Sequence, residues 1–165
     1  MPPTTDRREA TVRHSIRLVL LDEHDRLLLF SGTDEADGHT FWYPIGGGTE
    51  DGETPQQTAA REAHEETGLT DLVVGPEVWR RRAYATWGGT TYDCRERYFL
   101  ARVPAFDIDT SGFTEVERAT VTGHRWWTLA DLAANPDRIV PGDLPTRLAD
   151  LLLKGPPAEP ITLDA

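Results

Sequence analysis

Runs of hydrophobic residues, separated by turn-forming residues, divide the first third of this chain into strands. Two apolar-rich runs, Val12 to Leu21 and Arg26 to Phe30, flank the acidic stretch Asp22 to Asp25. This pattern predicts a strand, a short turn and a second strand, which together form a hairpin. A short aromatic run, Phe41 to Ile45, leads into three consecutive glycines. We expect a third strand followed by a turn whose backbone can approach an ion or a phosphate closely.

The segment from Thr54 to Gly68 is predicted to form one helix, with capping residues at both ends. Thr54 is a good N-cap, Pro55 suits the first helical position, and Gln57 completes a Thr-x-x-Gln capping box. Gly68 offers a left-handed C-terminal stop. The helix is therefore expected to begin after Thr54, to end at Gly68, and to pack its small alanines on a sheet.

Further strands are expected beyond this helix. The runs Leu72 to Trp87 and Tyr92 to Val103 surround Gly88-Gly89-Thr90, which predicts a second hairpin. The stretch from Pro104 to Thr122 is polar and interrupted by proline and glycine, so it is expected to be a loop. Another short strand should begin at His124.

Two helices are predicted to close the domain. A short one, from Leu129 to Ala134, is capped by Thr128, and a longer one runs from Leu144 to Lys154. The leucines of the longer helix recur at i, i+4, i+7 and i+8, which gives one apolar face. Mixed strands with helices on both sides predict an α/β fold, an α/β/α sandwich with a mixed central sheet.

Length and charge limit the classes of function. A chain of 165 residues fits one domain, expected over residues 12–154 with a flexible N-terminus at 1–11 and a flexible C-terminal tail at 155–165. The net charge of −11 disfavours nonspecific binding to nucleic acid, which needs a basic surface. A polyanionic substrate would be received through metal ions or a local basic cluster such as Arg80-Arg81-Arg82.

Cysteine content and hydropathy suggest a cytoplasmic protein that does not bind membranes. Cys94 is the one cysteine, so no internal disulfide is possible. No apolar run approaches the roughly 18 residues that a membrane span requires. The sequence leaves open whether the protein forms a homodimer.

Three glutamates of the predicted helix carry the most informative chemistry. Glu62, Glu65 and Glu66 lie three and four residues apart, which places their Cβ atoms roughly 5 to 6 Å from one another. Like charges so close are destabilising, and such local conflicts are typical of functional sites. Carboxylates suit Mg²⁺, and Mn²⁺ can substitute. The alternative is a solvated helix face with ion pairs such as Arg61 with Glu65.

The wider spacing decides between these interpretations. Gly47, Glu53, the string Arg61 to Glu66, and Gly68 follow the pattern Gly-x5-Glu-x7-Arg-Glu-U-x-Glu-Glu-x-Gly-U, where U is a bulky aliphatic residue. This pattern resembles the signature of the Nudix, or MutT-like, hydrolase family. Ala63 stands where a larger aliphatic is usual, which weakens a packing position only. The resemblance is most specific over residues 41–69 and extends more loosely over 12–153.

The resemblance implies the Nudix fold and a Mg²⁺-dependent pyrophosphohydrolase. Such an enzyme would cleave a phosphoanhydride bond in a nucleoside diphosphate linked to a nucleotide, a sugar or a phosphate, by attack of metal-activated water. By the same resemblance, Glu62 and Glu66 are the first metal ligands, followed by Glu65, with the Gly47 carbonyl as an additional one.

The resemblance also implies supporting and catalytic roles. Arg61 would hold the glutamates in place, and Glu53 would bind metal indirectly or stabilise its loop. Family members differ in their general base, so four residues stay open for this role, which are Glu65, Glu66, Glu115 and Glu117.

Two other functions and several substrates stay open. One alternative is a noncatalytic Nudix-fold module that senses a nucleotide; the other is an isoprenoid diphosphate isomerase, which Cys94 disfavours because it lies far from the motif. Tyr84, sixteen residues after Gly68, favours dinucleoside polyphosphates in this family. The alternative substrates are ADP-ribose, nucleotide sugars, oxidised nucleoside triphosphates and a capped RNA end. The capped RNA end is the one nucleic-acid partner considered. Six aromatic residues are available to stack a base, which are Trp42, Tyr84, Trp87, Tyr92, Trp126 and Trp127.

Overall fold

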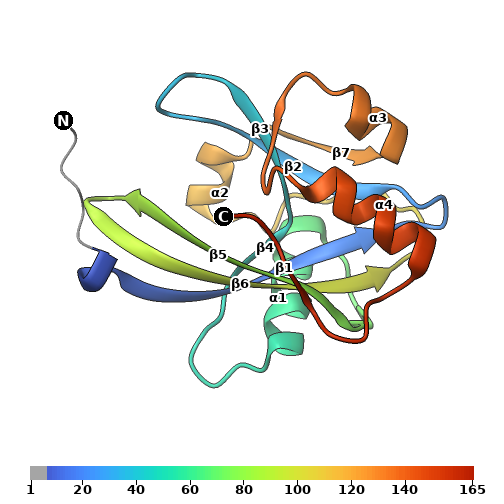
Figure 1. Ribbon diagram of the computed structural model, residues 1–165, viewed down its shortest axis with the longest axis horizontal. Coiled ribbons are helices and arrows are strands. Elements are labelled where there is room, and N and C mark those ends of the chain that lie inside the picture. The colour runs from blue at the N-terminus through green and yellow to red at the C-terminus, as the bar shows by residue number, and fades with distance from the viewer. Residues whose placement is uncertain (1–6) are drawn as a thin grey trace.

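A curled mixed sheet forms the centre of the molecule in the computed structural model, which describes residues 7–165 (Figure 1). The sheet has nine strands in the order β8-β3-β2-β1-β6-β5-β9, while β4 pairs with β1 and β7 pairs with β2. The strands are β1 Thr11–Leu21, β2 Leu27–Thr33, β3 Thr40–Pro44, β4 Gly46–Gly48, β5 Glu77–Trp87, β6 Thr90–Arg102, β7 Gly123–Trp127, β8 Arg138–Ile139 and β9 Ile161–Thr162. The helices are η1 Arg7–Glu9, α1 Pro55–Thr67, α2 Glu115–Thr120, α3 Leu129–Ala134 and α4 Leu144–Lys154.

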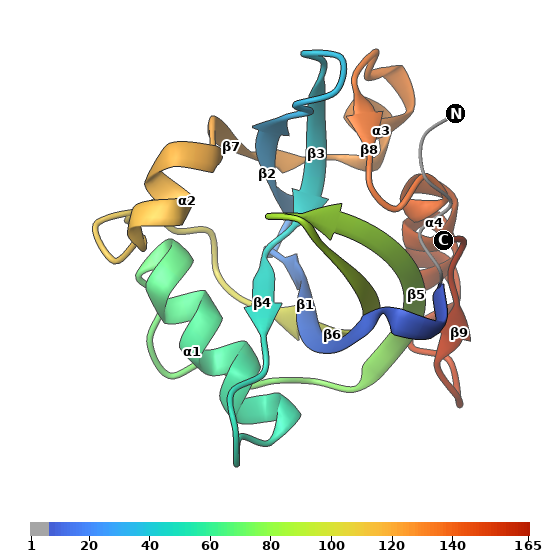
Figure 2. The same ribbon diagram turned by 90° about the vertical axis from the view of Figure 1, so that its left-hand side faces the viewer.

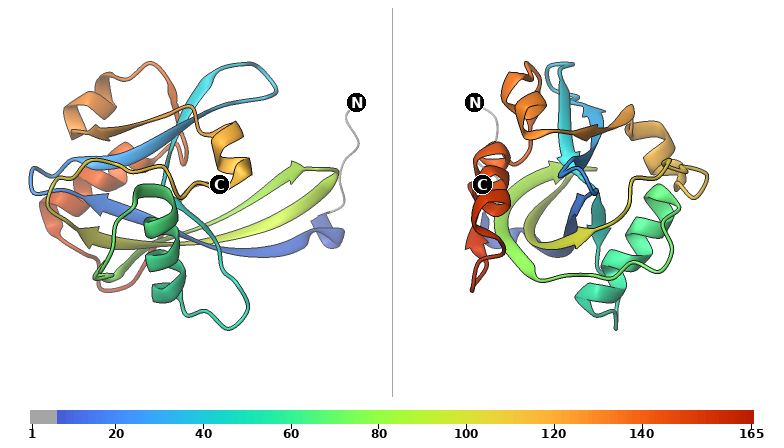
Figure 3. Two further views of the ribbon diagram at one scale, coloured as in Figure 1. Left: turned by 180° about the vertical axis from the view of Figure 1, so that it is seen from behind. Right: turned by 90° about the vertical axis from the view of Figure 1, so that its right-hand side faces the viewer.

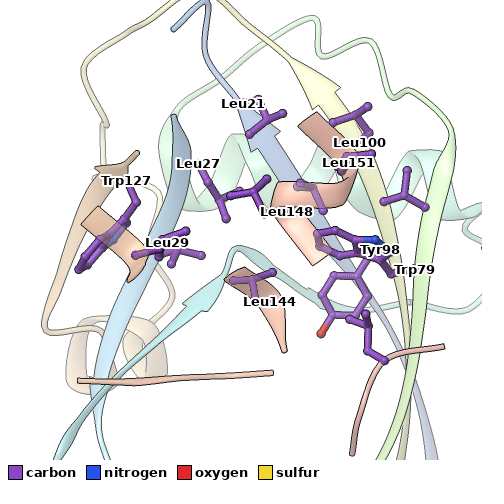
Figure 4. Packing of buried hydrophobic residues seen from close by; sticks show 14 residues of the cluster. Leu21, Leu27, Leu29, Trp79, Tyr98, Leu100, Trp127, Leu144, Leu148 and Leu151 are labelled. Carbon is purple, nitrogen blue, oxygen red and sulfur yellow. The ribbon is translucent and has the colours of Figure 1, made fainter. Parts of the chain in front are cut away.

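Helices cover both faces of this sheet, which confirms the predicted sandwich. In Figure 2, α1 and α2 lie on one side of the strands and α4 lies on the other, and the views in Figure 3 agree. The alternation of side chains along β1 explains the two layers. Leu18 and Leu20 pack with Ala59 and Ala63 of α1. The intervening residues belong to the cluster that contains α4 (Figure 4), whose labelled members include Leu21, Leu27, Leu29, Trp79, Tyr98, Leu144, Leu148 and Leu151.

Strand β1 pairs differently from the simple hairpin that the sequence predicts. It contacts β2 in register only at Leu21↔Leu27 and runs parallel to β6 along its whole length. Over Ser15 to Arg17, its other edge pairs with β4. Strand β2 instead pairs with β3 and β7. The predicted β5–β6 hairpin is confirmed, although its first strand begins at Glu77 rather than Leu72.

Two segments expected to be irregular are ordered. The polar loop 104–122 contains α2, because Thr114 and Glu117 form a reciprocal capping box. The tail 155–165, expected to be flexible, contributes β9, which pairs with β5, and Leu163, which is buried in the core. Burial of the apolar surface of this leucine stabilises the docked position of the tail. Of the expected flexible N-terminus, residues 1–6 lie outside the described residues.

The helices of the described chain, residues 7–165, are all too short or too polar to cross a membrane. Cys94 lies buried in β6. The fold thus places α1 beside the strand β4, which pairs with β1.

Candidate active site

Local signals fix both ends of α1, as predicted. The Thr54 hydroxyl accepts a hydrogen bond from the Gln57 backbone N–H at 3.2 Å, and the Gln57 side chain accepts one from the Thr54 N–H at 2.9 Å. At the other end, Gly68 adopts a φ of 75°, and its N–H donates to the His64 carbonyl at 2.9 Å. The helix is therefore held in one position along the sheet, which fixes the direction of its carboxylates.

Arg61 ties this helix to the loop that precedes it. Its Nε and Nη2 donate to the two carboxylate oxygens of Glu53 at 2.8 and 2.9 Å, and Nη2 also donates to the Gly48 carbonyl at 2.9 Å. Its Nη1 donates to Glu62 Oε1 at 2.9 Å and lies 3.6 Å from a carboxylate oxygen of Glu65. This bidentate, charge-assisted arrangement makes Arg61 an orienting group for the glutamates.

Glu53 is fully engaged in supporting the loop. Besides Arg61, it accepts hydrogen bonds from the Glu50 N–H at 2.8 Å and the Thr58 hydroxyl at 3.1 Å. The Arg61 guanidinium holds the pKa of Glu53 down to about 2. Its carboxylate is therefore ionised and already occupied, which fits the loop-stabilising role rather than direct metal contact.

Glu62 and Glu66 form a buried pair of carboxyl groups against β4. Glu62 is only 8% exposed, and Glu66 is only 5% exposed. Burial raises the pKa of Glu66 well above its usual value, and the neighbouring Glu62 raises it further. Burial likewise raises the pKa of Glu62, against the opposing effect of Arg61. Two adjacent carboxyl groups with little solvent are costly unless a cation or a proton compensates them.

Gly47 makes room for Glu62. A Cβ at position 47 would lie 2.3 Å from Glu62 Oε1, so a larger residue there would displace the carboxylate of Glu62. The Gly46 N–H lies 3.4 Å from Glu66 Oε2. Among residues 7–165, no three acidic, histidine or cysteine side chains form a ready-made metal cage. Glu65 is the least buried of the three, with its side chain 33% exposed beside Arg61.

The structure separates the two glutamates that the sequence left open on the later segment. Glu117 is one of the charges that raise the pKa of Glu66, after burial and Glu62. Its Oε1 accepts from the Thr114 N–H at 3.1 Å, whereas its Oε2 is buried with no hydrogen-bond partner in the described part of the chain. Glu115, on the same helix, is exposed. Only Glu117 is therefore brought to the site.

A cavity of about 480 Å³ is lined by residues of β1, β2, β3, β5 and β6, and Glu62, Glu65, Glu66 and Glu117 are not among its lining residues. Tyr43 connects the two regions, because it lines the cavity while both Glu66 and Glu117 influence its side chain. Burial, assisted by these two carboxylates, raises the pKa of Tyr43 to about 12. The cavity is also lined by Arg17, Phe41, Arg81, Trp87, Glu96 and Tyr98.

Sequence reasoning found only part of this cavity. Of the six aromatic residues suggested for base stacking, Trp87 lines it, whereas Tyr84 does not. Arg81 lines it as well, while Arg80 and Arg82 form ion pairs with Glu77 and Asp93. Arg17 was missed, although a charged residue inside the apolar run of β1 was a visible signal.

Comparison with known families decides the classification. The NUDIX domain family model matches residues 11–147, which include α1 and every carboxylate described above. The protein belongs to the Nudix family. Its class is that of hydrolases acting on phosphorus-containing acid anhydrides. A search of curated proteins found no match.

Solved structures share this Nudix fold at low sequence identity. The chain is similar to the MutT protein from Methanosarcina mazei Go1, with a TM-score of 0.64, 18% identity, and coverage of 88% of this chain and 99% of that one. An Ap4A hydrolase binary complex from C. elegans gives a TM-score of 0.61, 21% identity, and coverage of 86% and 98%. The NUDIX domain of Shewanella oneidensis NrtR, complexed with ADP ribose, gives 0.61, 19%, and coverage of 87% and 89%. At these identities the likeness shows the Nudix fold alone.

Proposed function

We propose that the protein is a Mg²⁺-dependent pyrophosphohydrolase that cleaves a phosphoanhydride bond in a nucleoside diphosphate linked to another moiety. One observation carries this proposal. The buried carboxyl groups of Glu62 and Glu66 lie against β4, where Gly47 leaves room for Glu62, and a cavity of about 480 Å³, large enough for a nucleotide-type ligand, is lined by Tyr43, whose pKa Glu66 raises.

The donor set fits a hard divalent cation. Glu62 and Glu66 would hold Mg²⁺, with Glu65 and the Gly47 carbonyl as further oxygen ligands, and Mn²⁺ would be accepted by the same oxygens. When bound, the metal would neutralise phosphate charge and acidify the attacking water. A cation would also relieve the repulsion that raises the pKa of Glu66.

The protein side chains divide the remaining work. Arg61 orients Glu62 and, through Glu53, fixes the loop that carries Gly48. Glu117 is our choice as the general base, because its free Oε2 can accept the proton of the attacking water. Glu66 is a weaker choice, since a carboxylate that ligates a metal is a poorer base. Glu65 is also less suited, since it lies beside the Arg61 cation.

The test is a hydrolysis screen in the presence of Mg²⁺. The panel should include ADP-ribose, a nucleotide sugar, a diadenosine polyphosphate, an oxidised nucleoside triphosphate and a capped RNA end. We expect phosphate or nucleotide release from at least one class, and at least a 100-fold loss of rate in Glu66→Gln with an unchanged circular dichroism spectrum. Tight nucleotide binding without turnover would favour the noncatalytic sensing module instead.

The choice of base has its own matched pair of variants. Glu117→Gln should lower kcat by about 100-fold and remove the acidic limb of the pH–rate profile. Glu115→Gln, two residues away on the exposed side of α2, should leave both unchanged. An unchanged profile in Glu117→Gln would return the role to a glutamate of α1.

A further inference from the structure

Arg17 is the last polar residue in its row of side chains along β1, after Arg13 and Ser15 and before Val19 and Leu21. Along β1, Ile16, Leu18 and Leu20 face the α1 layer. The alternate positions Val19 and Leu21 face the opposite layer, and Arg17 precedes them in that row. Placing a guanidinium in such a row costs free energy unless its charge and its donors are compensated. The protein therefore places a cation directly beside the apolar layer, one position in the row before the buried Val19 and Leu21.

Few of the donors of Arg17 are used within the protein. A guanidinium has five N–H donors. In the part of the chain spanning residues 7–165, Arg17 makes one hydrogen bond, from Nη1 to the Pro44 carbonyl at 3.1 Å. No carboxylate there lies within 4.0 Å of its nitrogens. Arg61, by contrast, has its donors distributed over Glu53, Glu62 and Gly48.

The position of Arg17 joins the carboxylate pair to the cavity. Arg17 pairs in register with Gly46 of β4, whose N–H lies 3.4 Å from Glu66 Oε2, and both Glu66 and Glu96 of the cavity lining act on the charge of its guanidinium. Its side chain also lines the cavity. The ring of Tyr43 has its centroid 5.8 Å from the guanidinium carbon. Its remaining donors are therefore available to a ligand that spans these two regions.

The other cationic group of this cavity is already paired. Arg81 Nη1 lies 3.5 Å from both carboxylate oxygens of Glu96, and its Nε donates to the Asp164 carbonyl at 3.1 Å. Glu96 also accepts from the Tyr98 hydroxyl at 2.6 Å. Arg81 and Glu96 thus compensate each other, which leaves Arg17 as the cation offered to a ligand in this cavity.

We propose that Arg17 binds the phosphate that connects the scissile bond to the base-bearing half of the substrate, and that the cavity takes the base. This inference rests on the proposed function. Arginine suits the task because its planar fork donates two parallel hydrogen bonds to phosphate oxygens. The rings of Phe41, Tyr43 and Trp87, which line the cavity, provide aromatic surface for a base.

Binding of non-hydrolysable probes tests this assignment independently of turnover. The first probe is the α,β-methylene analogue of ADP, and the second is methylenediphosphonate, which lacks the nucleoside. Both are titrated by calorimetry in the presence of Mg²⁺. Arg17→Met should weaken both probes by the same factor, about 10- to 100-fold, because the lost contact is to phosphate. The wild type should bind the ADP analogue more tightly than the diphosphonate, because only the former fills the cavity.

Two variants serve as controls. Arg82→Met removes the same charge from β5, where Arg82 pairs with Asp93, and should leave both affinities unchanged. Arg17→Lys keeps the charge without the planar fork and should give an intermediate affinity. It also replaces the methionine variant if that protein fails to fold, as judged by thermal melting.

Several outcomes would overturn the proposal. These are unchanged binding in Arg17→Met, an equal loss in Arg82→Met, a loss confined to the ADP analogue, or no binding of the analogue to the wild type. A loss confined to the analogue would indicate that Arg17 merely shapes the cavity. The proposed function is tested by a separate experiment, the hydrolysis screen. It would be wrong if the wild type hydrolysed no substrate of the panel.

Discussion

Replacing Gly47 with alanine is expected to remove metal-dependent hydrolysis while leaving the fold intact. A Cβ at this position would lie 2.3 Å from Glu62 Oε1 and 2.5 Å from its carboxyl carbon. That is roughly 1 Å closer than van der Waals contact allows, so the carboxylate must move. A displacement of about 1 Å in a catalytic group can cost about 100-fold in rate. We expect a loss of this size, with a higher Mg²⁺ concentration needed for half-maximal activity.

Stability should change little in the same variant. Gly47 does not adopt a positive φ, so alanine fits the backbone. Because alanine reduces the conformational entropy of the unfolded chain, this substitution by itself stabilises the folded state by about 0.4 to 1 kcal/mol. Displacement of Glu62 forfeits its hydrogen bond from Arg61, which contributes about 1.5 to 3 kcal/mol. The free energy of unfolding should therefore fall by less than about 3 kcal/mol.

The neighbouring glycines provide matched controls for this assay. A Cβ at Gly48 would meet only the flexible end of Arg13, at 3.3 Å, so Gly48→Ala should retain activity. A Cβ at Gly46 would lie 1.9 Å from the Ile16 carbonyl, so Gly46→Ala should destabilise the pairing of β1 with β4. Initial rates against Mg²⁺ concentration, with thermal melts, check all three. A wild-type Mg²⁺ dependence in Gly47→Ala would show that Gly47 does not position Glu62 for metal binding.

Two further predictions concern stability. Leu148→Ala, at a fully buried position of α4, should lower the free energy of unfolding by about 2 to 5 kcal/mol in denaturant titrations. Leu153→Ala, at a residue of the same helix that is 82% exposed, should change the free energy of unfolding by less than about 0.5 kcal/mol. Equal effects of the two substitutions would contradict the assignment of the buried face of α4. Arg61 lowers the pKa of Glu53 from 4.5 to about 2, so the stability contributed by ionised Glu53 is present above pH 4.5 and is lost as the pH falls toward 2. Melting temperatures of Glu53→Gln should therefore decline less than those of the wild type across this window, and parallel declines would argue against the ion pair.

Local signals made α1 predictable from the sequence. Thr54, Gln57 and Gly68 each act on backbone groups within three or four residues, so the capping box and the C-terminal stop needed no knowledge of the rest of the fold. The same holds for the crowding of the helix glutamates. The predicted elements and their layers therefore agree closely with the structure around this helix.

Features that depend on distant contacts were not predictable in the same way. Glu117 stood as one of two equal loop residues, because nothing local indicates which of them reaches Glu66. The docking of the tail depends on contacts with distant elements, namely the pairing of β9 with β5 and the burial of Leu163 in the cluster that contains α4. The role of Arg17 required knowing that β1 splits its pairing between β4 and β2.

Paramagnetic Mn²⁺ binding tests most directly the claim that the α1 carboxylates hold a divalent cation. Electron paramagnetic resonance can follow free Mn²⁺ during titration of the wild type and of Glu62→Gln and Glu66→Gln, with Glu115→Gln as a control of equal charge. We expect the wild type to bind Mn²⁺ at a site from which Mg²⁺ displaces it, and we expect this binding to be weakened at least about 10-fold in the two α1 variants only. Equal Mn²⁺ affinity in all four proteins would contradict that claim.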